Sequence, residues 1–349
     1  MRFSVLDQAP ARAGGGAAEA VRAAVRLAET ADELGFHRFW VAEHHAIGSV
    51  SISAPEVVLA MLADRTEGIR VGSGGMLLPN HRPIHVAEQF RVLEALHPGR
   101  IDLGIGRSEG ALDEAIVRAF ARPDDNAHGS GFEAQLDQLL AFGGVRPLPA
   151  DDPLASAVAS PADVPLPPVF LLGSSEQSAE TAARKGLGYG FAAHTNPDGA
   201  APALLRYRER FEPTAAREKP HAILAVKVMT GESDQHAAAL AAPSHLSMVW
   251  ARLGGHEPLP SVEEALAHRW TEEERAAEAT FIDTRADVTG GPDAVRARIA
   301  DLAEATQADE IIVITNTSDP DERLAAHRRF AAAVGLEPRR RAAPDATAR

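Results

Sequence analysis

The chain has 349 residues, of which 45% are hydrophobic and 24% are charged, a balance typical of a globular protein with one large or two ordinary domains. Its 49 acidic residues outnumber its 35 basic residues, and the net charge of −14 disfavours nucleic acid and anionic membranes as partners. The chain contains no cysteine, which excludes disulfides, thiolate metal sites and cysteine nucleophiles.

The first 120 residues alternate short β-branched runs with stretches in which apolar residues recur at helical spacing. Strands are predicted at 3–7, 38–45, 69–78 and 100–106. Helices are predicted between them at 18–34, 54–65 and 84–96. Gly35 follows the first helix as a stop signal, and Pro55 suits the first turn of the second. The repeated unit is therefore a strand followed by a helix.

The same alternation resumes after a proline-rich stretch. Further strands are predicted at 169–173, 189–194, 223–230 and 310–315, and further helices at 132–142, 177–185, 202–211, 292–304 and 320–334. Residues 231–285 show helical stretches at 235–240 and 262–268 without a convincing strand, so we interpret them as an insertion after the seventh strand. Residues 1–337 are predicted to form one domain, and 338–349 a disordered basic tail.

Eight strands that alternate with helices favour a (β/α)8 barrel, and a doubly wound open sheet is the alternative. The distribution of polar residues discriminates between them. Five polar residues stand at the carboxyl ends of four predicted strands, namely His44, Arg107, Ser174, Ser175 and His194. A barrel brings all these ends to one rim, whereas an open sheet gathers only those near its switch point.

The second strand ends in Glu43, His44 and His45. Because side chains alternate along a strand, Glu43 and His45 share one side and His44 points to the other. His44 is thus a candidate acid, base or hydrogen-bonding group at the rim, and a solvated histidine at a strand end is the alternative. Histidines 44, 45, 81 and 85 also allow a metal-dependent hydrolase as a rival function, although no established metal-binding pattern is present.

Glycines interrupt the third strand at Gly72, Gly74 and Gly75, where either a flat ligand approaches closely or a bulge aids packing. The fourth strand ends in GIGRSEG, whose spacing does not fit a dinucleotide fingerprint. Arg107 in this segment could hold a phosphate, or form a surface ion pair. The fifth strand ends in Gly173, Ser174 and Ser175 at the start of a helix, which suits an anion site or an ordinary helix cap.

Several segments, in order, resemble the bacterial luciferase-like flavin-dependent oxidoreductases, in particular the group 1 luciferase-family branch. The matching strings are RFWVAEHH, SAPEV, IRVGSGGMLLPNH, LEALHPGRIDLGIGR and LLGSS. They cover the first two hundred residues almost continuously, and the family fold is the same (β/α)8 barrel. The insertion and the loop 122–131 depart from the family pattern, and Gly106 stands where light-emitting luciferases have a cysteine.

The resemblance implies roles for individual residues. It places a cis peptide at Gly74–Gly75 against the flavin ring, and His44 at the catalytic position. It implies cofactor contacts, including those to the flavin phosphate, by Ser73, Gly74, Gly75, Arg107, Gly173, Ser174, Ser175 and Ser178. His194 would lie on the substrate side, where Asp198 to Ala201 and the insertion would select the substrate. No metal is implied.

The resemblance further implies a monooxygenase that uses reduced FMN and O2 on a small-molecule substrate, with a separate NAD(P)H:flavin reductase as partner. F420-dependent hydride transfer and a non-catalytic flavin-binding protein are the alternatives. A homodimer is expected from the relatives. The first residues show no signal peptide, and charged residues interrupt every apolar stretch, so we expect a cytoplasmic protein without a membrane-spanning segment.

Overall fold

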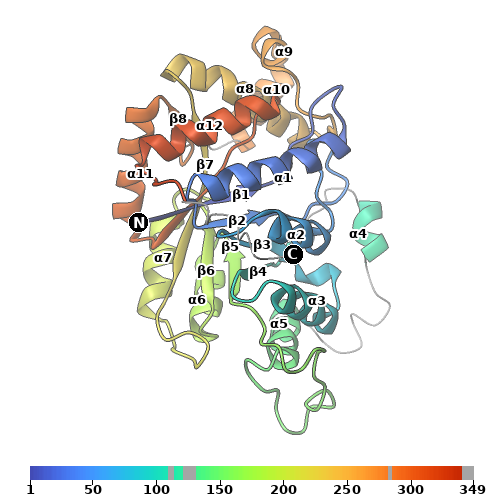
Figure 1. Ribbon diagram of the computed structural model, residues 1–349. Coiled ribbons are helices and arrows are strands. Elements are labelled where there is room, and N and C mark those ends of the chain that lie inside the picture. Colours follow the sequence, from blue (N-terminus) through green and yellow to red (C-terminus); the bar gives the residue numbers. More distant parts are fainter. Residues whose placement is uncertain (109–113, 121–130, 282–284, 340–349) are drawn as a thin grey trace, which may run out of the picture.

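A computed structural model describes residues 1–108, 114–120, 131–281 and 285–339, and shows a closed parallel β-barrel (Figure 1). The eight barrel strands are β1 (Arg2–Asp7), β2 (Arg38–Val41), β3 (Arg70–Leu77), β4 (Ile101–Gly106), β5 (Val169–Gly173), β6 (Gly188–Ala192), β7 (Ala222–Thr230) and β9 (Glu310–Ile314). Each strand pairs in parallel with the next, and β9 closes the sheet between β7 and β1. Closure confirms the predicted (β/α)8 barrel and excludes the open sheet.

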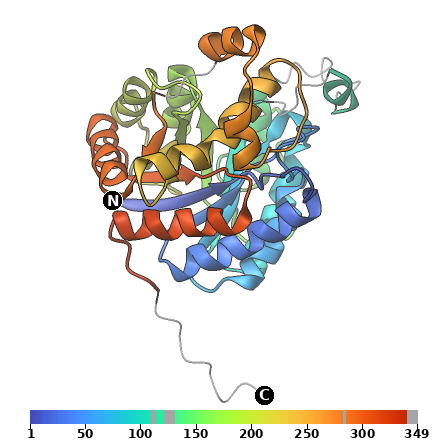
Figure 2. The same cartoon turned by 90° about the horizontal axis from the view of Figure 1, so that it is seen from above.

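Helices surround the barrel (Figure 2). Outside the insertion, the described residues contain α1 (Ala17–Glu33), α2 (Pro55–Arg65), α3 (Pro83–Leu96), α4 (Glu114–Phe120), α5 (Phe132–Phe142), α6 (Glu176–Arg184), α7 (Ala200–Glu209), α11 (Pro292–Thr306) and α12 (Pro320–Ala333). The helices α1 and α12 lie side by side across one face, in both views. Proline occupies the first turn of α2, α3, α11 and α12, where its missing N–H costs no hydrogen bond.

The strands bury both of their faces, which explains why they read as continuous apolar runs. Outward side chains such as Val5 and Phe39 belong to a large apolar core between sheet and helices. Inward side chains such as Leu6, Trp40 and Ile223 form a second core inside the barrel. Each large apolar side chain buried in either layer contributes about 1.5–3 kcal/mol.

The insertion after β7 folds into α8 (Asp234–Arg252), α9 (Val262–Ala267) and α10 (Glu272–Phe281), followed by the short strand β8 (Val288–Gly290). The predicted helix at 235–240 is the start of α8, which continues through the buried Pro243. The strand β8, absent from the prediction, pairs with the end of β7 and with no other strand among the described residues. Its three residues carry no strand pattern of their own, because the pairing depends on contacts distant in sequence.

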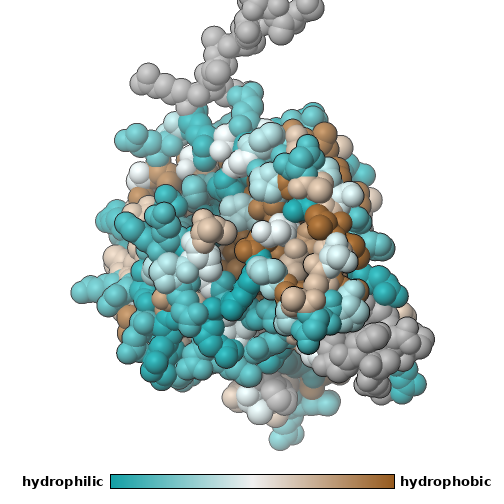
Figure 3. Space-filling view, turned by 90° about the horizontal axis from the view of Figure 1, so that it is seen from below, coloured by the Kyte–Doolittle hydropathy of each residue, from teal (hydrophilic) through white to brown (hydrophobic). Residues whose placement is uncertain are grey.

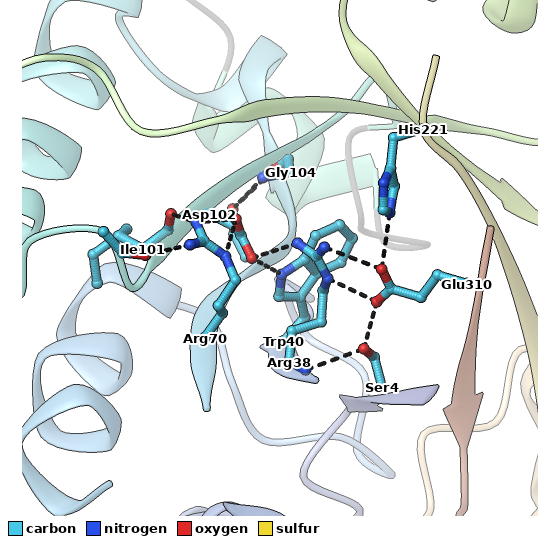
Figure 4. A network of polar contacts seen from close by, with 11 residues as sticks. Ser4, Arg38, Trp40, Arg70, Ile101, Asp102, Gly104, His221 and Glu310 are labelled. Atoms are coloured by element: carbon cyan, nitrogen blue, oxygen red, sulfur yellow. Dashed lines mark hydrogen bonds and ion pairs between the residues drawn. The ribbon is translucent and has the colours of Figure 1, made fainter. Parts of the chain in front are cut away.

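A buried ionic cluster fills the amino-terminal end of the barrel (Figure 4). Arg38 Nε and Nη2 donate to Glu310 at 2.7 and 3.0 Å, and Arg38 Nη1 donates to Asp102 at 2.6 Å. Arg70 makes two further bonds to Asp102 at 2.7 and 3.0 Å, and His221 Nε2 donates to Glu310 at 2.9 Å. This cluster, which the sequence analysis did not find, leaves the opposite end of the barrel for ligands.

Beyond α12, Arg339 donates to the carbonyl oxygens of Phe36 and Gly68 at 2.6 and 3.0 Å and pairs with Asp32 at 3.1 Å. Residues 340–349 of the predicted tail lie outside the described residues. Among the helices that the structure describes, none has the length and apolarity that crossing a membrane requires.

Candidate active site

A cavity of about 830 Å³, here called the first chamber, opens at the carboxyl ends of the barrel strands. It lies within the size range of small-molecule and cofactor sites. Its lining includes nine of the residues predicted for the site, namely His44, Gly74, Gly75, Arg107, Gly173, Ser174, Ser175, Ser178 and His194. The barrel therefore brings together residues that are up to 150 positions apart in the sequence (194 − 44).

Ser73, also predicted to contact the cofactor, is not among the described residues that line this chamber. Its side chain is fully buried on the other face of β3. The Ser73 hydroxyl donates to the Gly104 carbonyl oxygen at 2.8 Å and accepts from the Gly104 N–H at 3.1 Å. In this structure it joins β3 to β4.

Glycines form part of the chamber wall on β3 and β4. The peptide bond between Gly74 and Gly75 is cis, as the resemblance implies. A Cβ atom on Gly75 would lie 2.8 Å from the Gly104 carbonyl oxygen and 2.9 Å from Leu172 Cδ1, so a larger residue would displace its neighbours. The missing side chains leave backbone as the surface that a flat ligand could approach.

Two half-buried histidines face the chamber. The Nδ1 atoms of His44 and His194 are buried and have no hydrogen-bond partner among the described residues. Burial lowers the pKa of His44 to about 4. Burial, and then the charge of Lys227, lowers the pKa of His194 to about 4. Both imidazoles are therefore neutral near neutral pH, and each offers an unused nitrogen to a ligand.

Glu43 lies just after the end of β2 and faces away from His44, as the alternation predicts, and it organises the wall behind His44. It accepts hydrogen bonds from His45 Nε2 at 2.8 Å, from His81 Nε2 at 2.9 Å and from the Leu77 N–H at 2.8 Å. Burial acts to raise the pKa of Glu43, but the hydrogen bond and charge of His81 outweigh it, so this pKa lies below its usual value.

The same contacts bear on the rival metal-dependent hydrolase. His45 and His81 are engaged by Glu43, whereas His44 faces the chamber and His85 is exposed on α3. Within the described part of the chain, no group of three or more His, Cys, Asp or Glu side chains is arranged to hold a metal ion. The four histidines therefore do not converge on one site.

The rim between β4 and β5 carries groups suited to an anion. Arg107 is exposed after β4, and α6 begins beside it. Ser175 and Ser178 form a capping box: Ser175 Oγ accepts from the Ser178 N–H at 3.2 Å, and Ser178 Oγ accepts from the Ser175 N–H at 3.3 Å. The next N–H groups of the first turn have no partner within the helix and remain available to an anion. The divergent loop 122–131 lies outside the described residues except for Gly131, which lines the chamber.

A second chamber of about 340 Å³ adjoins the first and shares Gln8, His44, His194 and Thr195 with it. Its other walls come from β7, through Lys227, from the insertion helix α8, and from loop residues, namely Pro10, Ile47, Ser49, Val50, Leu259 and Asn316. The sequence analysis expected the insertion to select the substrate, but it did not single out Gln8, Lys227, Asn316 or individual residues of α8. Lys227 could have been noticed as the one charged residue in the apolar segment AILAVKVMT.

Comparison with known proteins assigns this barrel to a family. The model of the luciferase-like monooxygenases matches residues 1–309, and the chain belongs to that family. A luciferase-like monooxygenase of Escherichia coli (strain K12) is 35% identical over 326 residues, which cover 92% of this chain and 93% of that protein. The crystal structure of apo-MsnO8 has 36% identity and a TM-score of 0.85, and the match covers 97% of this chain and 99% of that one. The protein is therefore an enzyme of the monooxygenase type.

Other relatives differ in substrate and cofactor. The N-acetyl-S-alkylcysteine monooxygenase of Bacillus subtilis (strain 168) is 39% identical over 216 residues, 61% of this chain and 62% of that protein. The oxygenating constituent of 3,6-diketocamphane monooxygenase of Pseudomonas putida, solved with FMN, shares the fold at 19% identity and a TM-score of 0.66, with 95% and 98% of the chains covered. An F420-dependent secondary alcohol dehydrogenase shares the fold at 14% identity and a TM-score of 0.64, with 95% of this chain and 98% of that chain covered. The fold alone thus accommodates both cofactors.

Proposed function

We propose that this protein is a flavin-dependent monooxygenase that uses reduced FMN and O2 to oxidise a small organic molecule. The observation that carries the proposal is the first chamber, which combines a glycine-lined wall, two half-buried neutral imidazoles and a rim with groups suited to an anion. Support also comes from relatives of 35% and 39% identity that are named monooxygenases. Because GIGRSEG does not fit a dinucleotide fingerprint, we propose that a separate NAD(P)H:flavin reductase supplies the reduced FMN.

The residues present fit a flavin in chemistry as well as in size. Arg107 and the first turn of α6 would hold the phosphate, which a guanidinium and free N–H groups bind well. Gly74 and Gly75 would face the flat ring system, and the Leu6 and Ala225 side chains add apolar surface. When bound, reduced FMN supplies the electrons with which one oxygen atom of O2 enters the substrate and the other becomes water.

His44 is the residue that we propose as the catalytic acid or base. Because burial keeps its imidazole neutral, Nδ1 can accept a proton or a hydrogen bond at the reacting centre without first losing one. His194 lines the same wall and would orient the substrate. The apolar side chains around both histidines exclude water from the chamber and so reduce competing proton transfer.

The test is a set of binding titrations with oxidised FMN, reduced FMN and F420, on the wild type and on the variants Arg107→Ala and Ser175→Ala. We expect FMN to bind the wild type and both variants to bind it less tightly. In Arg107→Ala the dissociation constant should rise by about tenfold or more, because a charged hydrogen bond is lost. The matched control is Arg22→Ala, which removes an exposed arginine from α1, outside the chamber lining. Binding of F420 instead would favour hydride transfer and refute the FMN assignment.

Turnover separates an enzyme from a non-catalytic flavin-binding protein. Oxygen consumption and product formation would be followed with a flavin reductase and NADPH over a panel of small organic substrates. We expect His44→Asn to lower turnover by about a hundredfold or more while FMN still binds, as for loss of a general acid or base. Substrate oxidation unchanged in His44→Asn would contradict the role given to this residue.

We also propose a homodimer formed through α2 and α3, which are neighbours on the outside of the barrel. Val57 and Met61 on α2, and Val92 and Leu96 on α3, are 48–68% exposed although apolar, and each pair is spaced by four residues on one helix face. Seen from below, the described surface carries its apolar residues mainly on the right (Figure 3). Light scattering should show a dimer in the wild type and a monomer in Leu96→Glu; a wild-type monomer would refute the proposal.

A further inference from the structure

The second chamber differs from the first in its charge. Among the described residues that line it, two are cations, Lys227 and Arg252, and none is an aspartate or glutamate. The protein as a whole carries a net charge of −14, so this local excess of positive charge runs against the composition. Local positive charge in a lining without carboxylates favours an anionic ligand.

Lys227 points into the barrel at its carboxyl end, because it continues the alternating inward series of Ile223 and Ala225 on β7. Within the described residues, its ammonium forms no ion pair, and its contact is with the sulfur of Met248, a weak acceptor. Burial lowers the pKa of Lys227, against the opposing charge of Asp287. A partly buried ammonium without a strong acceptor is a group that an anionic ligand would satisfy.

The helix α8 covers the chamber with one face. Its lining residues, Ser244, Ser247, Met248, Ala251 and Arg252, recur at spacings of three and four, which places them on the same side of the helix. Arg252 is exposed and ends this face, so its guanidinium lies at the edge of the chamber rather than in its depth. The insertion therefore supplies hydroxyl groups and a second positive charge to a wall that the barrel alone would not have.

Further polar atoms in the chamber have no partner. Asn316 Nδ2 donates to Gln8 Oε1 at 2.6 Å, which leaves Asn316 Oδ1 buried and unbonded among the described residues. With the free Nδ1 atoms of His44 and His194, it gives this chamber three unsatisfied buried polar atoms, of which Asn316 Oδ1 can only accept and so suits a donor group of a ligand rather than a carboxylate. Each of these atoms needs a hydrogen-bond partner, which the polar groups of a ligand in the chamber would supply.

We propose that the second chamber binds a carboxylate of the substrate, with Lys227 as its counter-ion and Arg252 at its edge. This inference rests on the proposed function, because the shared wall of His44 and His194 would place the rest of the substrate in the first chamber. One inward-pointing ammonium balances the single charge of a carboxylate, whereas a doubly charged phosphate would need a second cation at the same depth. The preferred substrates are therefore small organic acids that are oxidised at a position away from the carboxylate.

The test compares acids with their neutral amides on the FMN-loaded protein by calorimetry. The probes are hexanoate with hexanamide and phenylacetate with phenylacetamide; the members of each pair are similar in size, but only the acid is charged, and only the amide also donates hydrogen bonds. We expect the acids to bind at least about tenfold more tightly than the amides, since hydrogen bonds to charged groups are the stronger ones. The preference should disappear in Lys227→Met, survive in Lys227→Arg and weaken in Arg252→Gln.

The matched control is Lys219→Met, which removes a lysine that is exposed and outside both chambers. It should leave the preference unchanged. Equal affinity for acids and amides, no binding of any of the four probes, or a preference that persists in Lys227→Met would each overturn the inference.

FMN titration of the same samples tests the proposed function independently, since Lys227 is outside the first chamber's lining. If FMN fails to bind while the acid preference is present in the apoprotein and depends on Lys227, the monooxygenase proposal fails and the carboxylate site stands. If FMN binds and the acid preference is absent, the carboxylate site fails and the FMN-binding site of the proposed function stands.

Discussion

The substitution Arg38→Met tests how much the ionic cluster at the amino-terminal end of the barrel contributes to stability. Arg38 donates three hydrogen bonds to two carboxylates and lies 4.9 Å from the ring centre of Phe170 and 5.4 Å from that of Trp40. Methionine retains much of the apolar volume but removes the charge. Glu310 would then be buried with a reduced set of partners.

The size of the expected stability loss depends on which contacts of the cluster remain in Arg38→Met. Three charge-assisted hydrogen bonds, at about 1.5–3 kcal/mol each, give an upper range of about 5–9 kcal/mol. Arg70 continues to pair with Asp102, and Ser4 and His221 continue to donate to Glu310, so part of this range is retained. We expect a loss of about 3–5 kcal/mol, the usual cost of removing one partner from a buried ion pair.

The assay is urea-induced unfolding, followed by tryptophan fluorescence and by far-ultraviolet circular dichroism, whose transitions must coincide. The control Arg206→Met removes a more exposed arginine paired with Glu180 at 3.3 Å and should cost less than about 1 kcal/mol. In the double variant Arg38→Met with Glu310→Gln, the loss should be at least about 1 kcal/mol smaller than the sum of the single losses. A loss below about 1 kcal/mol for Arg38→Met, or strict additivity in the double variant, would refute this reasoning.

Three further predictions concern other parts of the barrel. Burial acts to raise the pKa of Glu310, but Arg38 and His221 outweigh burial and lower this pKa from 4.5 to about 2. The ionised Glu310 therefore contributes stability above pH 4.5, and this contribution is lost as the pH falls towards 2. Urea midpoints should decline less between pH 4.5 and pH 2 in Glu310→Gln than in the wild type, and equal declines would contradict the prediction. Glu43→Gln should lower stability by about 1–3 kcal/mol in urea unfolding, because the charged acceptor of two histidines is lost; an unchanged midpoint would show that a neutral acceptor suffices. Gly104→Ala should lower the free energy of unfolding by about 1–3 kcal/mol, because the new Cβ would lie 2.2 Å from a backbone oxygen. Gly131→Ala, whose Cβ would have nothing within 4 Å, should change it by no more than about 0.5 kcal/mol. Equal losses of stability in the two variants would remove the steric explanation.

The sequence predicts the barrel well because each barrel strand is a short, nearly continuous apolar run that reports burial on both faces. It also predicts that Glu43 and His44 face opposite sides, because the two-residue alternation continues for a few residues after β2 ends at Val41. The features that it does not predict depend on closure of the sheet. Arg38 and Glu310 meet only because β9 returns to pair with β1, with Phe3 opposite Ile311.

The second chamber was beyond sequence reasoning for a related reason. Lys227 is visible as a charge within an apolar strand, but its neighbours are decided by how the insertion packs on the barrel. Pro243 suggests that a helix should end, yet it is buried inside α8, where packing offsets the missing hydrogen bond. Which face of α8 lines the second chamber therefore depends on tertiary packing and cannot be read from the local sequence.

The ionic cluster and the two chambers occupy opposite ends of the same strands, and this division has a consequence for how the enzyme can change. Substitutions on α8 should alter substrate preference without any thermodynamic coupling to Arg38 and Glu310, because widely separated sites contribute additively. The barrel thus allows selectivity to diversify, in evolution or in a library of α8 variants, while the amino-terminal end preserves the fold.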